Sequence, residues 1–173
     1  GSFNPPHVGH LLVTAYVLAT AEVDEVWLLP SYRHPFGKRL APFPDRVEMC
    51  RLLASYFASG VEVSTVEEDL GGEGRTIDTL RHLIPLHPRH DFRLVVGSDI
   101  LDEAPKWRSW DEIARLAPLI VVARGGHPHP LARGPAMPEV SSTEVRALLA
   151  ARGDTGGMVP RKILDYLDAR TLY

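Results

Sequence analysis

Short apolar runs alternate with longer segments of helical periodicity along nearly the whole chain. The apolar runs predict buried strands at residues 25–29, 61–66, 92–96 and 119–123. The helical pattern predicts helices at 11–21, 44–60, 76–86 and beyond residues 141 and 160, with loops at 67–75 and 124–138. Because strands alternate with helices, the sequence predicts an α/β fold in which helices sandwich a Rossmann-like parallel sheet.

The first ten residues form a loop that leads directly into the first predicted helix. The Pro5-Pro6 pair excludes a regular element there, whereas the following residues repeat at helical spacing. A helix N-terminus has unpaired N–H groups and the positive end of the helix dipole, so it attracts phosphate. His7 and His10 are three residues apart and face the same way, and Gly9 leaves room for a ligand against the backbone. This junction is therefore the first candidate phosphate site.

Length and charge limit the classes of function. A chain of 173 residues fits a single domain over residues 1–173. A net charge of -3 and a pI near 6.2 argue against binding to a nucleic acid polymer, which normally requires a basic surface. Any phosphate site is therefore expected to be local.

The single cysteine and the apolar runs bear on the compartment. Cys50 has no partner for a disulfide within the chain, and it falls in the apolar pattern of a predicted helix, which favours a buried structural thiol. No apolar run approaches the roughly 18 residues of a membrane span, and the first residues do not resemble a signal peptide. We therefore expect a cytoplasmic protein with no membrane partner.

The string G-S-F-N-P-P-H-V-G-H at residues 1–10 resembles the signature of the nucleotidylyltransferase superfamily. Its G-S-F-N-P form is most similar to bacterial nicotinate (or nicotinamide) mononucleotide adenylyltransferases. The resemblance extends to Leu172-Tyr173 and so covers nearly the whole chain. Family members generally carry a strand ahead of this loop, so the resemblance implies a first strand that is missing from the given sequence.

Two later motifs extend the resemblance to an ATP site. The string G-S-D-I-L at 97–101 follows a predicted strand, where doubly wound sheets bind ligands, and Asp99 is placed to accept hydrogen bonds from ribose hydroxyls. The string S-S-T-E-V-R at 141–146 opens a helix capped by Ser141 or Ser142, and Arg146 could clamp phosphate oxygens. The resemblance implies ATP binding by Gly1, Ser2, Phe3, Gly9, Gly97, Asp99, Ser142, Thr143 and Lys38, and catalysis by His7, His10 and Arg146.

The resemblance also implies a site for the pyridine mononucleotide. The residues concerned are Asn4, the backbone of Thr76, Lys106 and Trp107, whose indole is expected against the pyridine ring. Trp110 is interpreted as a core residue. Gly74-Arg75 replaces a Ser-Tyr pair common in the family, and Arg75 could favour an acidic substrate.

The implied reaction is attack by the 5'-phosphate of the mononucleotide on the α-phosphorus of ATP. It produces nicotinate adenine dinucleotide and pyrophosphate, a step of NAD biosynthesis, and needs no protein nucleophile. His7 is expected to contact the α-phosphate, with His10 beside it, while Arg146 and the backbone of Ser142 and Thr143 hold the β- and γ-phosphates. Mg2+ is expected to arrive with ATP, and no metal site of the protein's own is predicted.

The sequence leaves several alternatives open. The substrate could be nicotinamide mononucleotide, since the choice depends on one carboxylate against one amide. A pantetheine-phosphate adenylyltransferase shares the fold and chemistry, but that family has threonine where this chain has His7, and it lacks the Lys106-Trp107 pair. A non-catalytic nucleotide sensor is the alternative from another class. The sequence is compatible with a homo-oligomer but does not determine the oligomeric state.

Overall fold

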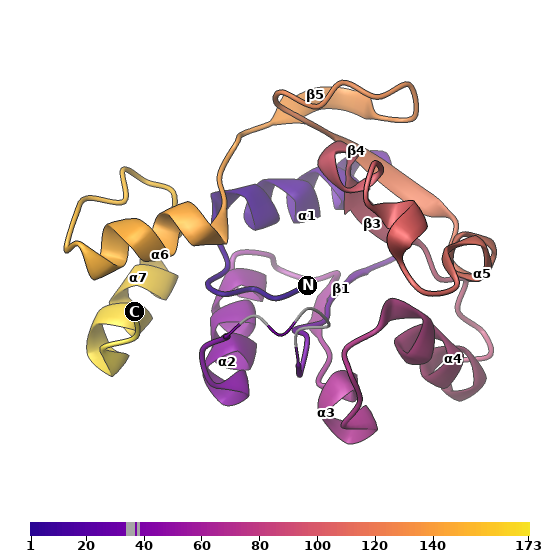
Figure 1. The fold of residues 1–173 in the computed structure, drawn as a ribbon, viewed down its shortest axis with the longest axis horizontal. Coiled ribbons are helices and arrows are strands. Elements are labelled where there is room, and N and C mark those ends of the chain that lie inside the picture. The colour runs from indigo at the N-terminus through magenta and orange to yellow at the C-terminus, as the bar shows by residue number, and fades with distance from the viewer. Residues whose placement is uncertain (34–36, 38) are drawn as a thin grey trace. The chain divides into compact units, whose positions relative to one another are not determined.

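The computed structural model describes residues 1–33, 37 and 39–173 of the chain (Figure 1). Two compact units make up the chain. The first unit comprises Gly1–Glu73 and Val140–Tyr173, and the second comprises Gly74–Glu139. The predicted single domain over residues 1–173 stays a prediction. Within the described residues, no helix combines the length and apolar character needed to cross a membrane.

The first unit contains a two-stranded parallel sheet and helices from both ends of the chain. Its elements are α1 (Val8–Thr20), β1 (Val26–Leu28), α2 (Phe43–Ala54), β2 (Val61–Val63), α3 (Val66–Leu70), α6 (Ser142–Ala150) and α7 (Arg161–Arg170). Strands β1 and β2 pair in parallel, with Val26 opposite Val61 and Leu28 opposite Val63. Helix α2 lies in the connection between them, as a parallel pair requires a long crossover.

The second unit contains a three-stranded sheet. Its elements are α4 (Thr76–Leu86), β3 (Leu94–Gly97), the 3-10 turns η1 (Ser98–Ile100) and η2 (Ala104–Lys106), α5 (Trp110–Leu116), β4 (Leu119–Arg124) and β5 (Arg133–Met137). The strand order is β3-β4-β5, and both pairings are parallel. Parallel strand pairs, with α2 between β1 and β2 and α5 between β3 and β4, confirm the predicted α/β class.

Each unit has its own apolar core. The core of the first unit joins the helices to the first loop and consists of Phe3, Leu28, Met49, Cys50, Leu53, Val140, Val145, Val159, Ile163 and Leu167. The smaller core of the second unit consists of Ile77, Leu80, Ile113 and Ala117. Cys50 is fully buried, and burial raises the pKa of its thiol to about 12, which confirms the predicted structural thiol.

The strand predicted at residues 61–66 is too long, and the loop predicted after it is wrong in part. Strand β2 ends at Val63, and Val66 instead begins the short helix α3. Three acidic residues in the first turn of α3 favour the positive end of a helix, and Gly71 ends the helix in the left-handed conformation. The predicted α2 is also too long, since it ends at Ala54 rather than near Gly60.

The loop predicted at residues 124–138 contains a strand. Strand β5 pairs with β4 through Val122 and Arg133, with a register shift before Arg124 and Met137. Four of its five residues are exposed, so it lacks the alternation of buried and exposed positions that marks a strand in sequence. Pairing with a neighbouring strand, rather than local pattern, creates β5.

Candidate functional site

His7 and His10 begin helix α1 and contact each other. His7 is the N-cap residue in an extended conformation, and its backbone N–H donates a 3.1 Å hydrogen bond to Nδ1 of His10. The two imidazole centroids lie 3.9 Å apart, and the ring of Phe3 lies 4.8 Å from that of His10. The motif thus folds into a compact cluster in which His7 is 5% exposed.

The hydrogen bond to His10 determines which of its ring nitrogens can donate to a ligand. Because Nδ1 accepts the N–H of His7, the proton of a neutral His10 imidazole lies on Nε2. Nε2 is therefore the atom of His10 that can donate to a phosphate oxygen. The backbone at the start of α1 fixes this tautomer.

Gly9 gives space to an imidazole within the motif. A Cβ atom at Gly9 would lie 3.0 Å from both Cε1 and Nδ1 of the His7 ring. The sequence predicts that the missing side chain leaves room for a ligand, whereas in the structure the His7 ring lies closest to that space. Any larger residue at position 9 would displace the ring.

The start of helix α1 is tied to a distant segment of the same unit. The backbone N–H of Val8 donates to the carbonyl oxygen of Met158 at 2.7 Å. This N–H is therefore engaged within the protein, which reduces the number of helix N-terminal donors available to a phosphate. The segment that precedes α7 takes part in positioning the first motif.

The second predicted phosphate motif opens helix α6. Ser141 is the N-cap residue, and its Oγ accepts the N–H of Glu144 at 3.1 Å. Of the two predicted capping serines, Ser141 is therefore the one that caps the helix. Ser142 and Thr143 occupy the first turn, and Arg146 follows one turn into the helix.

The two motifs, which lie near opposite ends of the sequence, meet in the first unit. Ser142 Oγ donates to the carbonyl oxygen of Pro5 at 2.9 Å, and Arg146 Nη1 donates to the carbonyl oxygen of Asn4 at 2.7 Å. Nη2 of Arg146 lies 3.2 Å from Oγ1 of Thr143. The loop that carries His7 and the helix that carries Arg146 are thus joined directly.

Asn4 is held from several sides. Its side chain is 2% exposed, and its Oδ1 accepts hydrogen bonds from Tyr173 Oη at 2.6 Å and from the N–H of Ala41 at 2.9 Å. The predicted contact between Asn4 and the mononucleotide stays a prediction. The internal partners show that Asn4 also anchors the first loop.

Arg46 is a second anchor that the sequence pattern did not reveal. It is 1% exposed, and its guanidinium donates to the carbonyl oxygens of Ser2 at 2.9 Å and Ala41 at 3.0 Å. Burial lowers the pKa of this guanidinium from its ordinary value, although backbone acceptors satisfy it. An arginine is ordinarily exposed, so its place in the sequence gives no sign of this burial.

In the second unit, the turn after β3 carries Asp99, the residue predicted to bind ribose hydroxyls. Asp99 lies in η1, and its Oδ2 is 3.4 Å from Nε of Arg124, at the end of β4. Oδ1 of Asp99 is buried, and no described residue gives it a hydrogen bond. A Cβ atom at Gly97 would collide with this oxygen. Gly97 thus allows a carboxylate to fold back over the strand end.

Ser98 ties this turn to the neighbouring strand. Its side chain is 3% exposed and donates to the carbonyl oxygen of His127 at 2.6 Å, while accepting the N–H of Arg124 at 3.0 Å. The turn carrying Asp99 is therefore fixed against the end of β4. The motif at 97–101 predicts roles for Gly97 and Asp99 alone, and the role of Ser98 is apparent only from its hydrogen bonds.

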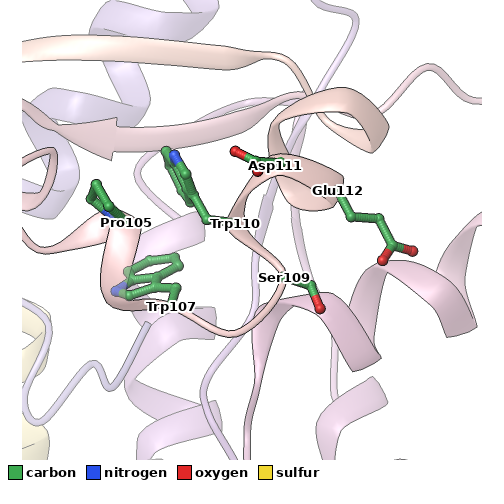
Figure 2. A pocket seen from close by; sticks show the side chains of 6 residues that line it. All are labelled: Pro105, Trp107, Ser109, Trp110, Asp111 and Glu112. Carbon is green, nitrogen blue, oxygen red and sulfur yellow. The ribbon is translucent and has the colours of Figure 1, made fainter.

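Trp107 and Trp110 line an open pocket of about 640 Å³ in the second unit (Figure 2). Their ring centroids are 5.8 Å apart at an interplanar angle of 83°. Both indoles are half-buried and pack against the core of the second unit, so Trp110, interpreted as a core residue, also lines the pocket. In Figure 2 the carboxylate of Glu112 points away from the indoles, and it pairs with Arg81 at 2.7 Å.

Three further residues of the predicted site are Thr76, Lys106 and Lys38. Thr76 is the first residue of α4, and Lys106 is exposed at the end of η2. Lys38 lies outside the described residues. Among residues 1–33, 37 and 39–173, no group of three or more His, Cys, Asp or Glu side chains could hold a metal ion.

Comparison with known proteins identifies relatives along the whole chain. The cytidylyltransferase-like family model matches residues 1–148. A protein of Anaeromyxobacter dehalogenans (strain 2CP-C) named "Probable nicotinate-nucleotide adenylyltransferase" is 53% identical over 176 residues, covering 100% of this chain and 93% of that protein. The nicotinate-nucleotide adenylyltransferase of Bacillus subtilis (strain 168) is 34% identical over 182 residues, covering 100% and 95%.

A solved structure shares the fold. Plasmodium falciparum nicotinic acid mononucleotide adenylyltransferase, complexed with NaAD, matches with a TM-score of 0.84 at 21% sequence identity. The match covers 100% of this chain and 94% of that chain. The predicted Rossmann-like α/β fold is thereby confirmed.

Proposed function

The chain belongs to the nicotinate-nucleotide adenylyltransferase family, and we propose that it transfers the adenylyl group of ATP to nicotinate mononucleotide. An oxygen of the mononucleotide 5'-phosphate bonds to the α-phosphorus of ATP. The bond from this phosphorus to the oxygen bridging to the β-phosphorus breaks, and pyrophosphate leaves. The products are nicotinate adenine dinucleotide and pyrophosphate, so the reaction belongs to NAD biosynthesis.

One observation carries this proposal in the first unit: the hydrogen bonds that join the two phosphate motifs. Arg146 and Ser142 bond to the carbonyl oxygens of Asn4 and Pro5, within the loop that leads to His7. A triphosphate needs several donors close together, and imidazole, guanidinium and helix N–H groups are such donors. The contact between the motifs supports a shared phosphate site.

We assign the chemistry to alignment and charge stabilisation. His7 contacts the α-phosphate, and Nε2 of His10 donates to an oxygen whose negative charge increases as the bond to pyrophosphate breaks. Arg146 and the first-turn N–H groups of α6 hold the β- and γ-phosphates. Gly1, Ser2 and Phe3 of the first loop, with Gly9 of α1, lie around the nucleotide. Mg2+ enters as part of the substrate MgATP, since triphosphate oxygens are its preferred ligands.

The second unit supplies the proposed contacts to the sugar and the pyridine ring. The buried Oδ1 of Asp99, which has no hydrogen-bond partner among the described residues, supports a role as acceptor for ribose hydroxyls. The half-buried indole of Trp107 in an open pocket supports stacking against an aromatic ring. Thr76 at the start of α4 and the exposed Lys106 are proposed neighbours of the acidic mononucleotide.

The fully buried thiol of Cys50 is consistent with a reducing compartment, and we propose the cytoplasm as the location of the protein. ATP and nicotinate mononucleotide are its proposed partners.

Pyrophosphate release in steady state tests the function. The purified chain is supplied with MgATP and, in turn, nicotinate mononucleotide, nicotinamide mononucleotide or phosphopantetheine. We expect release with nicotinate mononucleotide, and a higher kcat/KM for it than for nicotinamide mononucleotide, because this ratio reports differential transition-state binding. Faster turnover of phosphopantetheine would identify the pantetheine enzyme, and a folded protein with no release would favour the nucleotide sensor.

A further inference from the structure

We propose that Tyr173 is a positioning residue for adenylyl transfer, because it holds Asn4 and thereby the loop that carries His7 and His10. The inference rests on the proposed function for its kinetic readout. It concerns a residue whose hydroxyl group bonds to the loop that presents the two imidazoles.

The hydrogen bonds of the Asn4 side chain support this role. Tyr173 Oη donates to Asn4 Oδ1 at 2.6 Å, and the N–H of Ala41 donates to the same oxygen at 2.9 Å. Two donors on one amide oxygen define which end of the Asn4 amide is oxygen and restrict its rotation. Since Asn4 is 2% exposed, water cannot easily replace a lost partner.

The backbone of Asn4 links this contact to the phosphate motifs. Its carbonyl oxygen accepts Nη1 of Arg146 at 2.7 Å, and the chain reaches the N-cap residue His7 only three positions later. A shift of Asn4 would therefore move one partner of Arg146 and the start of α1 together. Small displacements of catalytic groups have large effects on rate because the reacting atoms must be closely aligned.

The phenol of Tyr173 is a hydrogen-bond donor at neutral pH. Burial raises its pKa well above the ordinary value of a tyrosine, although the positive charges of Arg146 and Arg46 act in the opposite direction. A protonated phenol can donate to Asn4 Oδ1, whereas a phenolate could not. The Tyr173 phenol is therefore protonated at neutral pH and can donate the hydrogen bond to Asn4 Oδ1.

Tyr166 provides a matched control in the same unit. Its Oη donates to Asp45 Oδ1 at 2.7 Å and so joins α7 to α2. Asp45 is 4% exposed and also accepts a hydrogen bond from Arg170. Tyr166→Phe therefore removes a tyrosine hydrogen bond to a buried oxygen, as Tyr173→Phe does, but at a helix contact that includes no phosphate motif.

The experiment compares kcat, KM and melting temperature of the wild type, Tyr173→Phe and Tyr166→Phe. We expect Tyr173→Phe to lower kcat about tenfold, with each KM changed by less than about threefold, because the lost contact aligns groups rather than binding substrate. Tyr166→Phe should lower the melting temperature and leave kcat unchanged. A kcat of Tyr173→Phe equal to that of the wild type would overturn the proposal.

Variants of Asn4 test the link through which Tyr173 acts. Asn4→Asp keeps an oxygen that can accept hydrogen bonds from both Tyr173 and Ala41. Arg146 and Arg46, whose positive charges act on the neighbouring phenol, would also favour the new carboxylate. Asn4→Asp should therefore retain at least about tenfold more kcat than Asn4→Ala. Adding Tyr173→Phe to Asn4→Ala should have little further effect, since the phenol has lost its acceptor. Full additivity of the two changes would contradict the link.

A readout without turnover separates this inference from the proposed function. If the wild type releases no pyrophosphate with any mononucleotide, the function fails, and the imidazole NMR resonances of His7 and His10 decide the positioning role. We expect those resonances to shift in Tyr173→Phe but not in Tyr166→Phe. Unshifted resonances in Tyr173→Phe would overturn the inference independently of activity.

Discussion

Arg146 Nη1 donates a 2.7 Å hydrogen bond to the carbonyl oxygen of Asn4, a residue 142 positions earlier in the chain. The guanidinium also lies 3.2 Å from Oγ1 of Thr143 through Nη2. These contacts orient the planar group, so that its remaining N–H donors can serve a ligand. The orientation depends on the fork of an arginine and would not be reproduced by an ammonium group.

Arg146→Lys should therefore reduce catalysis even though the charge is kept. A lysine cannot bond Asn4 and Thr143 and still offer two directed donors to phosphate oxygens. We expect kcat/KM for ATP to fall about 100-fold, measured by initial rates of pyrophosphate release. Arg161→Lys is the control, since Arg161 is an exposed residue of α7 whose guanidinium pairs with Asp165 on the same helix. A wild-type rate in Arg146→Lys would contradict the proposed clamp.

His10→Ala should remove the donor proposed to stabilise charge in the transition state. We expect kcat to fall about 100- to 1000-fold, the usual cost of losing one such donor. His7→Ala should lower kcat by a comparable factor, because the His7 ring lies against that of His10. His90→Ala, an exposed histidine of the second unit, is the control in the same rate assay. Unchanged adenylyl transfer in a folded His7 or His10 variant would show that its assigned role is wrong.

Gly97→Ala should weaken ATP binding through Asp99. The added Cβ would collide with Asp99 Oδ1, so the carboxylate has to turn away from its present position. We expect the Kd for ATP, measured by calorimetry, to rise about tenfold, as for the loss of one good polar contact. Gly72→Ala is the matched control, because the nearest atom to its Cβ is Leu70 O at 3.9 Å. Equal affinities in the two variants would exclude the proposed ribose contact.

Cys50 should be unreactive in the folded protein. Ionisation of its thiol should destabilise the fold at alkaline pH. Burial raises the pKa of the thiol from 9.0 to about 12, so the folded state favours the protonated form. This contribution to stability is complete below pH 9 and is lost as the pH rises from 9 to about 12. A thiol reagent at pH 8 should label Cys50 only after denaturation. Rapid stoichiometric labelling of the native protein would contradict the burial.

Much of the fold follows from local sequence pattern. Helix α4 occupies the predicted residues Thr76–Leu86, where the helical spacing of apolar residues is clear, although its N-cap residue Arg75 provides no side-chain cap. The strands β1 and β3 fall within or one residue beyond their predicted runs. By contrast, the apolar pattern predicts a strand and a loop where α3 forms, although the acidic first turn and Gly71 are helix signals. Strand β5 depends on pairing with β4 and has almost no local signal.

The candidate site was predictable where interacting residues are close together in the sequence. His7 and His10 meet as their spacing predicts, and Ser141 caps α6. The anchors of the loop were not predictable, because Arg46 and Tyr173 reach it from distant segments. Such contacts depend on how the elements pack, which a pattern along one sequence does not describe.

The proposed mechanism requires His10 and Arg146 to act on one triphosphate. A double-mutant cycle of His10→Ala and Arg146→Lys, with kcat/KM for ATP as the measured quantity, tests this most directly. If both side chains hold the same transition state, the double variant should be far less impaired than the product of the two single effects. Two effects that multiply exactly would show that the residues act independently, and the shared phosphate site would have to be abandoned.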